Sequence, residues 1–141
     1  MKFFAIFAAL AASALAQTVN IGSPKDGSTI APGPLNVTID RPDTLTGSTE
    51  VAVVISIVPC SNGPCPDPAE RLGSTLYQGS YDPQFPPIRT PDTQPQQNFT
   101  VTVPSSLAGQ RALLSVVHLS LVGAGPFPLF EIKNVTVNVS G

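Results

Sequence analysis

Apolar and polar residues alternate along much of the chain, in short runs that prolines and glycines separate. In residues 34–39, Leu35, Val37 and Ile39 share one parity, and polar residues share the other. Residues 98–103 repeat this alternation. Because successive side chains of a β-strand point to opposite faces, each run predicts a strand with one face in a core and one in water.

Seven runs are expected to form strands, and they cover residues 18–22, 34–39, 50–58, 74–81, 98–103, 111–121 and 130–139. The run 50–58 is apolar on both parities, which is typical of a central, covered strand. In 130–139 the apolar parity changes between Ile132 and Val135, which predicts a β-bulge near Lys133 and Asn134. Together the runs predict one all-β domain over residues 17–141, a seven-stranded antiparallel sandwich of immunoglobulin- or fibronectin-III-like type.

The first 16 residues have a different pattern. Lys2 precedes an apolar run over residues 3–12, and Ala14-Leu15-Ala16 supplies the small residues before a signal-peptidase cut. The apolar run is shorter than the roughly 20 residues that span a bilayer. We therefore expect residues 1–16 to be a signal peptide, and the mature protein to begin at Gln17 and to be secreted.

The cysteines and asparagines fit this route. Cys60 and Cys65, the two cysteines, are predicted to form a local disulfide in an oxidising compartment, with free thiols and a metal site as weaker alternatives. Four of the six asparagines begin N-glycosylation triplets, namely Asn36, Asn98, Asn134 and Asn138. Each lies on the parity opposite to its apolar neighbours, so an attached glycan would point to water.

The charge pattern narrows the range of partners. The net charge is −2 at pH 7, with no run of basic residues and no second long apolar segment. These features disfavour nucleic acid and anionic membranes as partners. The chain also ends without an apolar tail, so we expect no membrane anchor and a soluble monomer.

Residues with an evident catalytic role are sparse. His118, the one histidine, shares its parity with Leu114 and Val116, so we interpret it as a packed strand residue rather than a general base or metal ligand. Most of the nine carboxylates lie in turn-like contexts. Secreted copper oxygenases use a histidine at the mature N-terminus, where this chain has Gln17. We therefore predict no enzymatic activity, no cofactor and no metal.

Two features are candidates for binding a partner. The loop 82–97 contains five prolines, and its residues Phe85, Ile88 and Arg89 are candidate contacts, although Phe85 could instead be tucked beneath an ordinary loop. Tyr77 and Tyr81 share a parity in 74–81 and could stack on a sugar. We favour the interpretation that they cover the edge of the core.

Several segments carry a family resemblance through their order and spacing. They are Leu76-Tyr77-Gln78-Gly79, Asn98-Phe99-Thr100-Val101-Thr102-Val103-Pro104, Gly109 followed by Ala112-x-Leu114-x-Val116-x-His118-x-x-Leu121-x-Gly123-Ala124, and Pro128-x-x-Glu131-x-x-Asn134-Val135-Thr136-Val137. In these segments the chain resembles the necrosis-inducing secreted protein 1 family of fungal effectors. The resemblance covers most of the mature chain.

The resemblance implies a secreted fungal virulence protein without catalytic activity. Such a protein would act in host tissue, bind and inhibit kinases associated with plant immune receptors, and so suppress pattern-triggered immunity; it could also provoke plant cell death. His118 and Glu131 would then be framework residues. Two alternatives remain open on the fold alone: a carbohydrate- or wall-binding module, and an enzyme of unknown class.

Overall fold

The computed structural model describes residues 18–44 and 46–141. The predicted signal peptide and Gln17 lie outside these residues. No helix in the described part is long and apolar enough to cross a membrane.

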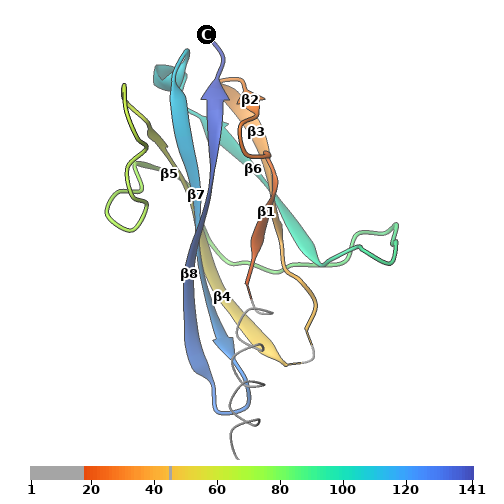
Figure 1. The fold of residues 1–141 in the computed structure, drawn as a ribbon. Helices are drawn as coiled ribbons and strands as arrows, with labels where there is room; N and C mark the ends of the chain where they lie inside the picture. The colour runs from red at the N-terminus through yellow and green to blue at the C-terminus, as the bar shows by residue number, and fades with distance from the viewer. Residues whose placement is uncertain (1–17, 45) are drawn as a thin grey trace, which may run out of the picture.

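Two β-sheets face each other (Figure 1). The three-stranded sheet has the order β1-β3-β6, formed by Asn20–Ser23, Gly33–Asp40 and Gln96–Val103. The five-stranded sheet has the order β2-β8-β7-β4-β5, formed by Thr29–Ile30, Phe127–Val139, Arg111–Val122, Ser48–Pro59 and Ser74–Gly79. Neighbouring strands are antiparallel except for β2 and β8. A short 3₁₀ helix, Ser105–Leu107, precedes β7.

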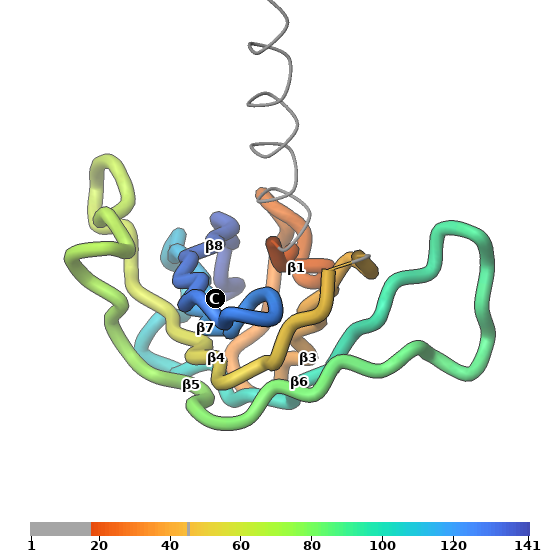
Figure 2. The backbone as a smooth tube through the Cα atoms, turned by 90° about the horizontal axis from the view of Figure 1, so that it is seen from below, coloured from red at the N-terminus to blue at the C-terminus, as the bar shows by residue number. Residues whose placement is uncertain are grey.

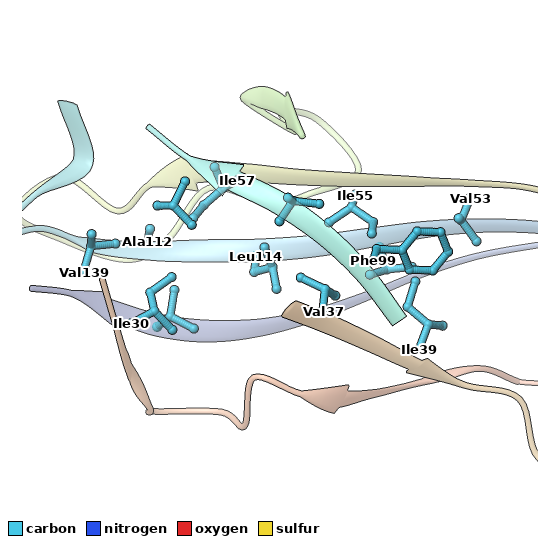
Figure 3. Close-up of a cluster of buried hydrophobic side chains, with 14 of the residues drawn as sticks. Ile30, Val37, Ile39, Val53, Ile55, Ile57, Phe99, Ala112, Leu114 and Val139 are labelled. Carbon is cyan, nitrogen blue, oxygen red and sulfur yellow. The ribbon is translucent and has the colours of Figure 1, made fainter. Parts of the chain in front are cut away.

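The core lies between the sheets and is built from the inward parity of each strand. In β3, Val37 and Ile39 are buried, and in β6 every second residue from Phe99 to Val103 is buried. They meet Ile55 of β4 and Leu114 of β7 from the facing sheet (Figure 3). Burying each such side chain contributes about 1.5–3 kcal/mol. The prediction of an all-β sandwich is thus confirmed.

The strand count differs from the prediction, because the described part of the chain contains eight strands instead of seven. The additional strand, β2, has only two residues, Thr29 and Ile30, which pair with Asn138 and Val139. Two residues are too few to show an alternating pattern. The assignment to the immunoglobulin or fibronectin-III type stays a prediction.

The predicted bulge near Lys133 and Asn134 is wrong. β7 and β8 pair without interruption from Arg111↔Asn138 to Val122↔Phe127. The apolar parity changes because Phe130 and Ile132 are apolar residues on the outer face of the sheet, while Glu131 and Lys133 share the inward parity of Val135 and Val137. The strand itself does not shift.

The predicted pairing of the two cysteines is present in the structure. Cys60 and Cys65 form a disulfide with a Cα–Cα distance of 4.3 Å. They pack with Val58 and Leu113 in a small apolar cluster, separate from the main core. The disulfide thus closes the loop that follows β4.

The core assignment predicts different costs for two leucines of β7. Leu114 is fully buried, whereas Leu121 is 36% exposed. We expect Leu114→Ala to lower the free energy of unfolding by about 3 kcal/mol, because it leaves a cavity that its neighbours cannot fill. Leu121→Ala should cost less than about 1 kcal/mol. Urea unfolding of the two variants measures the difference, and equal losses would contradict the core described here.

Candidate functional site

The most unusual local arrangement surrounds His118, which lies in β7 with no exposed surface. Its Nδ1 is 3.0 Å from Oε1 of Glu131 on β8, and its Nε2 is hydrogen-bonded to Oε2 of Glu50 on β4. A neutral imidazole has one donor nitrogen, whereas an imidazolium has two. The arrangement therefore fits a charged His118 between two carboxylates.

A β-bulge brings Glu50 to this position. β4 pairs with β7 through Glu50↔Ser120 and Ala52↔Leu119, so Val51 has no partner and is 42% exposed. The extra residue resets the alternation, and Glu50 joins the inward face of Val53 although the two differ in parity. A strict alternation places Glu50 outward, which is why the sequence did not identify it.

Arg41 follows β3 and balances the second carboxylate charge. Its Nε donates to Oε1 of Glu50 at 2.8 Å, and its Nη2 donates to Oγ of Ser48 at 2.7 Å. The residue is only 6% exposed. This pairing offsets part of the cost of removing the guanidinium and the Glu50 carboxylate from bulk water.

Glu131 also holds the beginning of the described chain. Its Oε2 accepts a hydrogen bond from the Thr18 hydroxyl at 2.6 Å, and its Oε1 accepts one from the Val19 backbone N–H at 2.7 Å. Tyr81 closes another side of the cluster, with its ring centroid 5.6 Å from that of His118 in an edge-on arrangement. We call Arg41, Glu50, His118 and Glu131 the histidine cluster.

Burial and hydrogen bonding act in opposite directions on these groups. Burial is the largest influence on the pKa of His118 and lowers it, but hydrogen bonds to Glu131 and Glu50 outweigh burial and hold the pKa above its ordinary value. For both carboxyls burial raises the pKa, but hydrogen bonds, led by the one from His118, bring it below the ordinary value. The charged forms of all three groups are therefore favoured.

The contacts of His118 are all made within the fold. Both His118 nitrogens are already bonded and the ring is inaccessible to solvent. Within the described residues, no group of three or more His, Cys, Asp or Glu side chains is arranged to hold a metal ion. The cluster joins the segment after β3 and strands β4, β7 and β8 to the start of the described chain.

The proline-rich loop extends away from the sandwich in both views (Figure 1 and Figure 2). We call residues 82–95 the arm. Its base is closed by paired backbone hydrogen bonds between Gln84 and Gln96, at 3.0 and 2.9 Å. Ile88 is 85% exposed, while Phe85 is half-buried with the Arg89 guanidinium 4.2 Å from its ring centroid. The three candidate contact residues therefore lie together on the arm.

A polar hollow of about 430 Å³ lies between the base of the arm and the segment that joins β3 to β4. Arg41, Glu50 and Tyr81 form part of its wall, next to Asp82 and Pro83 of the arm. The histidine cluster therefore adjoins the point where the arm leaves the sandwich.

The two tyrosines do not form an exposed platform. Tyr81 is 3% exposed, and its hydroxyl donates to the Ile39 carbonyl at 3.2 Å. Tyr77 is half-buried, with its ring centroid 4.6 Å from that of Phe99. Both therefore cover the edge of the core, as the favoured interpretation expected.

The four predicted glycosylation asparagines are exposed and lie on outer faces of the sandwich. Asn36 and Asn98 are on β3 and β6, where the Asn36 Nδ2 donates to the Asn98 Oδ1 at 3.4 Å. Asn134 and Asn138 are on β8. The parity argument thus gave the correct face for all four.

Comparisons with known proteins identify a family and distant similarity to solved structures. A family model described as the Nis1 family matches residues 14–138. No protein with a curated description matches the chain. A solved cellulose-active polysaccharide monooxygenase from M. thermophila is 17% identical with a TM-score of 0.45, and the match covers 82% of this chain and 54% of that one. The chain thus spans about half the length of that protein.

The histidine cluster predicts a maximum of stability in mildly acidic solution. The raised pKa of His118 contributes stability that is complete below its ordinary value of 6.5 and is lost as the pH rises through the folded-state value. The lowered pKa of Glu50 and Glu131 contributes stability that is present above their ordinary value of 4.5 and is lost as the pH falls. We therefore expect the free energy of unfolding to be highest between about pH 4.5 and 6.5.

Urea unfolding between pH 4 and 9 measures this profile. Glu131→Gln removes one carboxylate partner of His118. The free energy of unfolding of this variant should therefore decline less steeply above pH 6.5 than that of the unmodified protein. The ring signals of His118 in an NMR titration report its pKa directly. Stability that rises from pH 6.5 to 8.5 would contradict the charged assignment.

Proposed function

The chain belongs to the Nis1 family, and on that premise we propose that it is a secreted fungal effector that binds a host protein and has no catalytic activity. Its target is a kinase associated with a plant immune receptor, and inhibition of that kinase suppresses pattern-triggered immunity. The protein's own contribution is a binding surface. The observation that carries the proposal is the arm, which extends from the sandwich and exposes Ile88.

The arm has the properties of a segment prepared for binding. Prolines restrict the backbone to extended conformations, so the arm loses less conformational entropy when it is bound. Its base is fixed by the backbone pairing of Gln84 with Gln96. Ile88 offers apolar surface, and the adjacent Arg89 offers a guanidinium that can donate to a carboxylate.

Because the candidate contact residues lie on a protruding arm, we expect the partner to bind them in a cleft. Proline-rich extended segments are recognised by grooves that accept a preformed backbone. The arm reaches beyond the outline of both sheets (Figure 2), so it can enter such a groove without a clash from the sandwich. We infer that Ile88 and Arg89 make the central contacts.

The wall-binding alternative loses its proposed contact residues, because Tyr77 and Tyr81 pack on Phe99. The histidine cluster supports a framework role for His118, because its ring is saturated with hydrogen bonds and has no exposed surface. The first point counts against the wall-binding alternative, and the second supports the absence of a catalytic role for His118.

A titration of the secreted, glycosylated mature chain against purified kinase domains of plant immune co-receptors tests the proposal. We expect binding together with a loss of kinase activity. Replacing Ile88 and Arg89 by alanine should weaken binding at least tenfold, about 1.4 kcal/mol, because the contacts at the end of the arm are removed.

The matched control is Leu121→Ala, which removes a partly exposed leucine from β7 instead of the arm. It should leave affinity unchanged, and thermal unfolding should show that all variants remain folded. Absence of binding at tens of micromolar would reject the kinase target. Equal effects of the arm and control variants would reject the arm as the contact surface.

A further inference from the structure

The outer face of the five-stranded sheet carries an apolar surface that the core does not use. Val54, Val117 and Ile132 lie side by side on β4, β7 and β8, because Val54 pairs with Val117 and Val117 pairs with Ile132. Phe130 lies two residues before Ile132 on the same face of β8 and is 64% exposed. These four residues and the segment 68–73 line a hollow of about 500 Å³. We call the four residues the outer apolar row.

Among residues 18–44 and 46–141, no strand pairs with the edge of β8 next to this row. Thr136 and Asn138 direct their backbone groups away from β7, since they bond to Asp26, Gly27 and Ser28. Backbone groups of the same parity at Phe130, Ile132 and Asn134 point the same way. In the described part of the chain these three have no backbone partner on that side. An open edge beside exposed apolar side chains favours unwanted pairing between chains.

Asn134 lies where a cover for this surface would be attached. It is two residues from Ile132 on the same face of β8, and it faces the small Ser115 of β7. It is exposed, and its side chain makes no hydrogen bond to the described residues. The side-chain amides of Asn36, Asn98 and Asn138 all take part in such bonds.

We propose that Asn134 carries an N-linked glycan whose first sugar rings cover the outer apolar row and block the open edge of β8. The C–H face of a pyranose ring can lie against Ile132 and Val117 while its hydroxyls face water. Ser115, the partner of Asn134 on β7, is fully buried, so the accessible surface at this pair belongs to Asn134 itself. The occupant of this face is therefore part of the protein itself.

The attachment uses the ordinary chemistry of the secretory pathway. The Asn134 Nδ2 attacks C1 of the first N-acetylglucosamine of a polyprenyl-pyrophosphate-linked oligosaccharide. The N–C1 bond forms, the bond from C1 to the pyrophosphate oxygen breaks, and the amide loses one proton while the lipid pyrophosphate leaves. Thr136 supplies the hydroxyl of the acceptor triplet. The inference requires secretion and does not depend on the kinase target.

The test uses the mature chain secreted from a eukaryotic host. Mass spectrometry of glycopeptides should show Asn134 occupied. Thr136→Ala removes this triplet and keeps Asn134, while Thr100→Ala removes the triplet of Asn98 on the other sheet and is the matched control. We expect Thr136→Ala to raise the fluorescence of a hydrophobic dye several-fold and to form dimers or larger species at 10–100 μM. Thr100→Ala should do neither.

Two further measurements test the proposal if the Thr136→Ala variant is not secreted. Enzymatic release of the glycans from the folded, unmodified protein should produce the same rise in dye fluorescence. Adding Ile132→Ser to Thr136→Ala should reverse it, because the substitution removes apolar surface from the outer apolar row. An unoccupied Asn134 in the secreted protein would overturn the proposal, and so would dye binding that is the same after glycan release.

Discussion

The rest of the structure depends on the paired charges around His118. An isolated ion inside a protein is costly, so each charged member of the histidine cluster needs its partner in place. Glu50 meets both His118 and Arg41, and Glu131 meets both His118 and the start of the described chain. Because these partners come from different strands, the cluster fixes the positions of β4, β7 and β8 relative to the segment after β3.

This constraint also determines how the arm is presented. Arg41, Glu50 and Tyr81 border the hollow from which Asp82 and Pro83 lead into the arm. Tyr81 is held by the edge of the His118 ring and by the Ile39 carbonyl. The arm therefore starts from a rigid position although its end is exposed. Such an arrangement suits the proposed role of the arm, because binding segments are commonly loops held by a rigid scaffold.

The parts of the fold that could be predicted are those where one face of a strand meets water. Residues 34–39 and 98–103 alternate because the outer face of the three-stranded sheet is polar, with Asn36 and Asn98 on it. Glu50 was missed because the bulge at Val51 turns the Glu50 side chain to the inner face of the sheet. In a strand that is apolar on both parities, such a bulge leaves no break in the alternation that the sequence could reveal. β2 was missed because it has two residues. The arm could be foreseen because prolines give it a composition of its own.

The wrong prediction of a bulge in β8 and the presence of the outer apolar row have the same cause. The change of parity was assigned to the backbone because apolar residues were assumed to face the core. The backbone is regular, so Phe130 and Ile132 must face outward. Apolar side chains on an outer face need either a partner or a cover, since contact with water is unfavourable. The acceptor triplet that begins two residues after Ile132 is where the proposed glycan would supply this cover, within the same strand. The change of apolar parity in β8 that led to the wrong prediction therefore marks the place where apolar side chains face outward and a cover is expected.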